Sequence, residues 1–178
     1  MADIMTKEDR SVRMSHIHFA STKPELCLRH ALWNLGFRYR VNVKRLPGSP
    51  DIVLPKYRTV IFVHGCFWHG HNNCKTSHIP ETNTDFWMAK IARNQERDQE
   101  VWRQLEAKGW FVVIVWECQL KKAVLDETIT QVKAEILHNG ELLRCSQVNR
   151  RKAMEAYRQE MRARKEREAT LKAELKHQ

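Results

Sequence analysis

Residues 50–74 read PDIVLPKYRTVIFVHGCFWHGHNNC and combine two short apolar runs with a cluster of histidine, cysteine and aromatic residues. Runs rich in Val and Ile that are bounded by turn residues predict strands, here at 51–54 and 59–63. The polar and aromatic cluster begins where the second strand ends. Because a strand is a rigid support and a loop leaves side chains accessible, we expect this junction to carry the chemistry of the protein.

The flanking segments predict a mixed sheet flanked by helices. Residues 22–36 predict a helix that opens with a Thr-x-x-Glu capping box. Residues 38–43 alternate as a strand does, residues 84–108 predict a long helix, and residues 110–117 form an apolar strand typical of the interior of a sheet. A helix between two strands lets them run parallel, so the predicted fold class is α/β.

The predicted long helix has polar residues on the face that should be buried. Its apolar stripe includes Ile91 and Leu105, and Asn94 and Asp98 interrupt this stripe. We therefore expect part of the face to meet a polar group.

A chain of 178 residues favours one domain with an appendage. We divide it into an N-terminal arm at 1–20, a core at 21–140 and a basic helical extension at 141–178. The core ends with a helix at 126–138, and a long charged helix is predicted from residue 146, because no Gly or Pro follows. Four basic residues of the arm fit either phosphate contacts or a solvated helix: Arg10, Arg13, His16 and His18.

The formal net charge of +10 points to a polyanionic partner, with nucleic acid first. Residues 144–178 hold 11 Lys or Arg against 5 Glu, so +6 of this charge lies in the extension and the rest of the chain is only mildly basic. No apolar run is long enough to span a bilayer, and no secretory start is visible. We therefore expect a cytoplasmic protein.

Four residues have a spacing typical of a structural zinc site: Cys66, His71, Cys74 and Cys118. Structural zinc takes four such ligands in a tetrahedron and leaves no open position. The alternative is a set of core cysteines near incidental histidines, and His64, His69 or His78 could replace His71. An odd number of cysteines in a cytosolic chain favours metal ligation or free thiols over disulfides.

Asp51 directly follows Pro50 at the start of a strand, where a buried carboxylate is costly unless it has a partner. A magnesium ion is one such partner. The alternative is that Asp51 only caps the preceding turn. Glu25 is explained equally well as the third residue of its capping box.

Four segments together resemble the very short patch repair (Vsr) mismatch endonucleases: 47–51 (PGSPD), 62–69 (FVHGCFWH), 84–91 (TDFWMAKI) and 115–118 (VWEC). The resemblance covers about residues 8–140. It implies a PD-(D/E)xK restriction-endonuclease-like fold and a strand-nicking endodeoxyribonuclease. Such an enzyme cuts duplex DNA 5′ of the thymine of a T:G mispair that arises from deamination of 5-methylcytosine.

The resemblance also implies the roles of individual residues. Asp51 and the backbone carbonyl of Val63 would bind the catalytic Mg²⁺. His69 would transfer a proton at the attacking water with His64 in support, and Glu25 would hold a metal-bound water or His69. The structural zinc would be bound by Cys66, His71, Cys74 and Cys118, and the DNA-intercalating wedge would be Phe67, Trp68 and Trp87. For these aromatic residues, the alternative is packing within the zinc loop or the helix core.

The implied partner is double-stranded DNA with a T:G mismatch. The protein would act as a monomer in the cytoplasm, associated with the nucleoid and with no membrane. A functional link to a cytosine-5 DNA methyltransferase is also implied.

Three features depart from the family pattern. Val63 replaces the usual threonine, one extra residue precedes Cys74, and the extension, which we expect to add nonspecific DNA affinity, has no counterpart. Two other functions fit the sequence: a restriction-type endonuclease without mismatch specificity, and a non-catalytic zinc-stabilised DNA-binding module.

Overall fold

The structure is a computed structural model that describes residues 21–174, with side chains up to residue 162. Its contacts divide the chain into two units, Met1–Asn139 and Gly140–Gln178. The expected N-terminal arm at 1–20 lies outside the described residues, and so do its four basic residues, Arg10, Arg13, His16 and His18.

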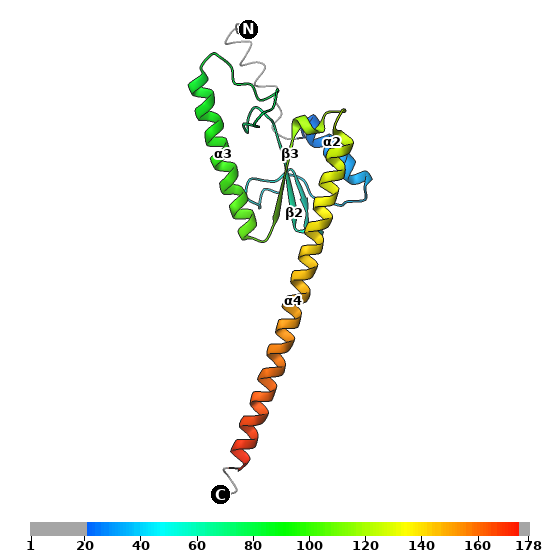
Figure 1. The fold of residues 1–178 in the computed structure, drawn as a ribbon, viewed down its shortest axis with the longest axis vertical. Coiled ribbons are helices and arrows are strands. Elements are labelled where there is room, and N and C mark those ends of the chain that lie inside the picture. Colours follow the sequence, from blue (N-terminus) through cyan, green and yellow to red (C-terminus); the bar gives the residue numbers. More distant parts are fainter. Residues whose placement is uncertain (1–20, 175–178) are drawn as a thin grey trace. The chain divides into compact units, whose positions relative to one another are not determined.

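The first unit contains a three-stranded mixed sheet (Figure 1). Its strands are β1 (Ile52–Leu54), β2 (Thr59–His64) and β3 (Phe111–Trp116), in the order β1-β2-β3. β1 pairs with β2 antiparallel and β3 pairs with β2 parallel. The parallel register places the last residue of β2 opposite the last residue of β3. The ends of β2 and β3 and the start of β1 therefore lie at one edge of the sheet. The predicted mixed sheet is confirmed.

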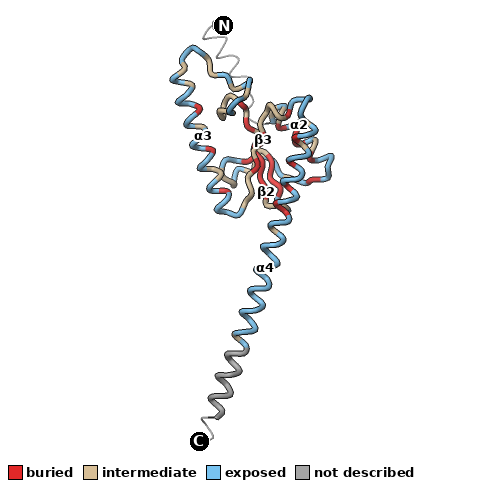
Figure 2. Tube along the Cα trace, in the orientation of Figure 1, coloured by how far each residue is buried: buried red, intermediate tan, exposed pale blue. Residues whose placement is uncertain are grey.

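Helices cover both faces of this sheet, because its strands alternate apolar residues between two cores. The helices are α2 (Lys23–Asn34), α3 (Thr84–Ala107) and α4 (Leu125–Glu174), and short 3₁₀ turns follow β1 (Pro55–Tyr57) and β3 (Glu117–Leu120). One core joins Leu28 of α2 and Ile136 of α4 to Ile61. The other core joins Leu105 of α3 to Val60. Figure 2 shows the buried residues concentrated along β2.

Two sequence-based expectations about the sheet are wrong. Residues 38–43 do not form a strand, because only Arg40 pairs with Val53, through two backbone hydrogen bonds of 2.8 Å. Asn42 has a φ of 46°, in the left-handed region, and this turn ends the extended segment. β3 lies at an edge of the described sheet and not in its interior. Its continuous apolar sequence is explained by the two helical layers, which cover both of its faces.

A tight turn sets the direction in which the chain enters β1. Gly48 has a φ of 67°, and a Cβ atom built there would lie 2.5 Å from Cγ1 of Val101 on α3. Only glycine fits both this backbone conformation and this close approach. The turn therefore packs directly against α3 and fixes Asp51, three residues further on.

The extension and the last helix of the core form one continuous helix, α4. α4 runs without a break through Gly140, so the two helices expected at 126–138 and from residue 146 are one. Nearly all of residues 141–162 are exposed (Figure 2). Within residues 21–174, no helix combines the length and the apolar character needed to cross a bilayer.

Candidate active site and metal centre

Asp51 immediately precedes β1, and its carboxylate Oδ2 accepts a hydrogen bond of 2.8 Å from the backbone N–H of Val63 on β2. Burial raises the pKa of Asp51 to about 6, and the neighbouring carboxylate of Glu25 adds to the increase. The Val63 hydrogen bond and the charges of Arg29 and His69 act in the opposite direction. Ionised Asp51 is therefore in an unfavourable position that a bound cation would relieve.

Two histidine rings stack beside this carboxylate. His64 is the last residue of β2 and is 5% exposed. Its ring lies on the ring of His69, with 3.8 Å between centroids and 17° between planes. Burial lowers the pKa of His64 to about 4, and the charge of His69 adds to this effect. His64 is therefore neutral at pH 7.

The structure adds a residue to the predicted site. Asp98 of α3 is buried, and its carboxylate bonds Nδ1 of His69. Burial acts to raise the pKa of Asp98. The hydrogen bond and charge of His69, together with smaller contributions that include a 3.1 Å hydrogen bond from Arg97, outweigh burial, so the pKa lies below its ordinary value. The contact holds the imidazole by Nδ1, and its other nitrogen, Nε2, takes no part in this contact.

A signal for Asp98 was present in the sequence. Asn94 and Asp98 interrupt the apolar stripe of α3, and the structure identifies the polar groups that they meet. Asn94 donates a 2.8 Å hydrogen bond to the carbonyl of Trp68, whereas Asp98 bonds His69. The interrupted stripe thus marks where α3 holds the loop after β2. The ligand atoms of His64, His69 and Asp98 lie within 4.8 Å of one another, so this group could also accept a cation.

Glu25 is buried, and both of its carboxylate oxygens accept hydrogen bonds. One oxygen accepts hydrogen bonds from the backbone N–H and the hydroxyl of Thr22, as the capping box predicts. The other accepts from Ser21 N–H and from Arg29. Arg29 also donates to the backbone carbonyl of Asp51 at 3.1 Å. Glu25 and Arg29 therefore tie the start of α2 to Asp51, the residue before β1.

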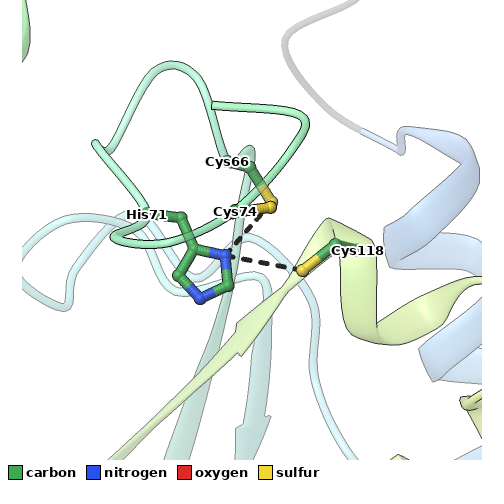
Figure 3. A group of neighbouring side chains, drawn as sticks. All are labelled: Cys66, His71, Cys74 and Cys118. Carbon is green, nitrogen blue, oxygen red and sulfur yellow. Dashed lines mark hydrogen bonds between the residues drawn. The ribbon is translucent and has the colours of Figure 1, made fainter. Parts of the chain in front are cut away.

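The four predicted zinc ligands form a compact group (Figure 3). Their ligand atoms all lie within 4.8 Å of one another. Nδ1 of His71 is 3.5 Å from Sγ of Cys66 and 3.4 Å from Sγ of Cys118. Tetrahedral zinc with ordinary bond lengths separates such nitrogen and sulfur ligands by about 3.6 Å. The donor set and spacing therefore fit zinc, and His78 is not part of this group.

An aromatic residue lies between the sulfur-rich group and the histidine pair. The ring of Trp116, the last residue of β3, stacks on His71 with 4.1 Å between centroids and 2° between planes. The same ring meets the edge of His64 at 5.5 Å. Trp116 therefore fixes the orientation of His71 and connects the two groups physically.

The predicted wedge residues also lie together. The rings of Phe67, Trp68 and Trp87 pack edge to face, with centroids 5.1–6.1 Å apart, and all three side chains are half-buried. The neighbouring Phe86 packs against Trp87 and is 56% exposed. An apolar aromatic cluster therefore lies on the loop and helix that also carry His69 and Asp98.

These features define a class of protein. A buried carboxylate with a raised pKa, a carboxylate-oriented imidazole and an aromatic cluster lie at one edge of a sheet. In a chain of net charge +10, they indicate an enzyme that hydrolyses nucleic-acid phosphodiesters.

Comparison with known proteins identifies the family. The model of the DNA mismatch endonuclease Vsr family matches residues 2–76. The chain is 52% identical to the type II nicking enzyme V.NmeAIP of Neisseria meningitidis over 137 residues, which are 76% of this chain and 97% of that protein. It is 44% identical to the DNA mismatch endonuclease Vsr of Escherichia coli K12 over 133 residues, which are 74% and 85% of the two chains. The chain belongs to the Vsr family and is an endonuclease.

A third relative extends the pattern. The type II nicking enzyme V.XorIIP of Xanthomonas oryzae pv. oryzae is 44% identical over 120 residues, which are 67% of this chain and 88% of that protein. The matches cover most of each relative but leave about a quarter of this chain or more unmatched. Part of this protein therefore has no counterpart in these relatives.

Proposed function

We propose that this endonuclease nicks duplex DNA 5′ of the thymine of a T:G mispair, in a Mg²⁺-dependent reaction of very short patch repair. One observation supports this function most strongly: Asp51, His69 and the aromatic cluster gather at the edge of the sheet where β2 ends. The E. coli relative is named a mismatch endonuclease, and the other two are named nicking enzymes. We also propose that the fold is a branch of the PD-(D/E)xK nucleases.

The proposed metal ligands are the carboxylate of Asp51 and the backbone carbonyl of Val63. Bound Mg²⁺ would neutralise charge that develops on the phosphate during cleavage. A backbone ligand does not depend on the side chain at residue 63, so Val63 can serve where the family usually has threonine. Burial of Asp51 favours this role, because a cation removes the penalty on its ionised form.

We propose that His69 accepts the proton of the attacking water. Its Nδ1 is held by Asp98, so Nε2 is free to act as general base. His64 supports the ring of His69 by stacking and stays neutral. Glu25 belongs to the proposed set through its proximity to Asp51, whose pKa it raises, and through Arg29, which binds the Asp51 carbonyl.

We propose that Phe67, Trp68 and Trp87 act as a wedge that opens the base stack beside the mispair. Inserting apolar side chains costs a few kcal/mol per unstacked step, and a mismatch lowers this cost. The three rings pack against each other, so they would enter the stack as one preformed unit. Selectivity for a mismatch would then arise partly from the deformability of the DNA.

Asp98→Asn tests the assignment of the base. We expect this variant to nick mismatched duplex about 10- to 100-fold more slowly, because the amide no longer stabilises the protonated His69 ring. Single-turnover nicking of a T:G duplex measures the effect. Glu106→Gln is the matched control, since it removes an exposed carboxylate from the same helix. Equal rates for Asp98→Asn and Glu106→Gln would contradict the role of Asp98.

The direct test of the proposed function uses oligonucleotide duplexes that differ in one base pair, incubated with Mg²⁺ or chelator and resolved strand by strand. Nicking of the thymine strand of the T:G duplex is expected, with the fully paired duplex intact. Equal cutting of paired duplex would favour a restriction-type endonuclease. Tight binding without nicking would favour a non-catalytic DNA-binding module.

A further inference from the structure

The second unit carries an arginine row that the catalytic site does not use. Four arginines of α4 recur at intervals of seven, seven and four residues: Arg144, Arg151, Arg158 and Arg162. At about 100° per residue, these intervals place all four side chains within an arc of about 40° on the helix. The row extends about 27 Å along the helix axis, at about 1.5 Å per residue. We call these four residues the arginine stripe.

The stripe is exposed and carries a net positive charge. All four side chains are exposed. In the part of the chain that the structure describes, none of the four takes part in an ion pair. Glu155 borders the stripe, whereas Glu141 and Glu160 project further round the helix. One face of the helix therefore has a net positive charge that remains available to a partner.

We propose that the arginine stripe is a second DNA-binding surface, which holds the phosphate backbone of the duplex outside the catalytic site. The family acts on DNA, and a row of guanidinium groups along a straight helix complements a row of phosphates. Phosphate contacts carry no sequence information, so the stripe adds affinity and not specificity. The proposal rests on the DNA-acting class of the family and not on mismatch recognition or Mg²⁺ chemistry.

The same helix supplies a control for total charge. Arg150 and Lys152 are the immediate neighbours of Arg151, and they project about 100° to either side of it. Both are exposed. The variants Arg151→Gln/Arg158→Gln and Arg150→Gln/Lys152→Gln therefore remove the same charge from the same helix, but only the first removes it from the stripe.

Binding of a fully paired duplex, measured by fluorescence anisotropy against salt concentration, tests the proposal. Each phosphate contact contributes about 0.9 to the slope of log K against log salt, so the stripe variant should flatten the slope by about 2. The control variant should keep the slope of the parent chain. Circular dichroism establishes that both variants retain the helix. Nicking of a mismatched duplex at low salt should be the same in both, because neither change touches the catalytic site.

Other outcomes overturn the proposal. Equal flattening by both variants would mean that the extension acts through total charge and not through one face. Unchanged slopes in both would mean that α4 does not bind DNA.

A second experiment tests lipid as the partner. Three apolar residues lie beside the stripe: Leu143, Met154 and Met161. Binding of both variants to vesicles of phosphatidylglycerol and phosphatidylcholine is therefore measured as well. Loss of vesicle binding without loss of DNA binding in the stripe variant would assign the surface to lipid. Absence of nicking by the parent chain would contradict the proposed function and leave the salt test valid.

Discussion

Asp51→Asn should abolish strand nicking while the fold stays intact. The substitution removes a proposed ligand of the catalytic ion, and the lost stabilisation of several kcal/mol corresponds to a rate reduction of about a thousandfold or more. The asparagine carbonyl can still accept the Val63 N–H hydrogen bond that Asp51 accepts now. Single-turnover nicking of a T:G duplex at saturating Mg²⁺ measures the effect.

The stability of this variant distinguishes a catalytic role from a structural one. Burial raises the pKa of Asp51 to about 6, above its unfolded value of 3.8. The ionised form is therefore disfavoured in the folded protein, and stability is lost as the pH rises from 3.8 through 6. A neutral asparagine avoids this penalty at pH 7, so thermal melting without metal should occur at the same or a higher temperature. A lower melting temperature with residual nicking would show that Asp51 is a structural cap.

Cys118→Ser should release the proposed zinc and destabilise the fold. Cys118 follows β3, whereas the other three ligands lie on the loop after β2, so one ion would hold these two segments together. Loss of a structural metal is one of the few single-site changes that costs about 3–5 kcal/mol, equivalent to roughly 10 °C in a chain of this size. Zinc content by mass spectrometry and thermal melting measure the two effects.

Cys145→Ser is the control for this experiment, because Cys145 is an exposed free thiol outside the ligand group. It should retain one zinc ion per chain and the melting temperature of the parent. Nicking by Cys118→Ser should also fall, because His71 stacks on Trp116, which contacts His64. Full zinc occupancy in Cys118→Ser would instead assign the fourth ligand to another residue.

Local patterns predicted α2, α3 and the strands of the stretch at residues 50–74, because their signals are contained in a few neighbouring residues. The capping box of Glu25 and the strand before His64 are examples. The expected strand at 38–43 failed, because alternation cannot reveal the left-handed turn at Asn42. The edge position of β3 was missed for a related reason: burial by two helical layers and burial inside a sheet produce the same apolar sequence.

The candidate site, like the fold, was predicted from the sequence only in part. The spacing of cysteines and histidines was sufficient to predict a group that the structure brings within 4.8 Å. Asp98 was visible only as a polar interruption of an apolar helix, since its partner, His69, lies 29 residues earlier in the chain. The contact between Trp116 and His71 depends on strand register, which no local pattern encodes.

The central claim is that a cation at Asp51 and a base at His69 cut one strand beside a mispair that the aromatic cluster has opened. The most direct measurement compares two duplexes of identical sequence, one with T:G and one with C:G at a single position, each labelled separately on its two strands. With Mg²⁺, we expect one product, from the thymine strand of the T:G duplex, cut on the 5′ side of the thymine. Equal cleavage of both duplexes, or cleavage of both strands at one site, would contradict the account.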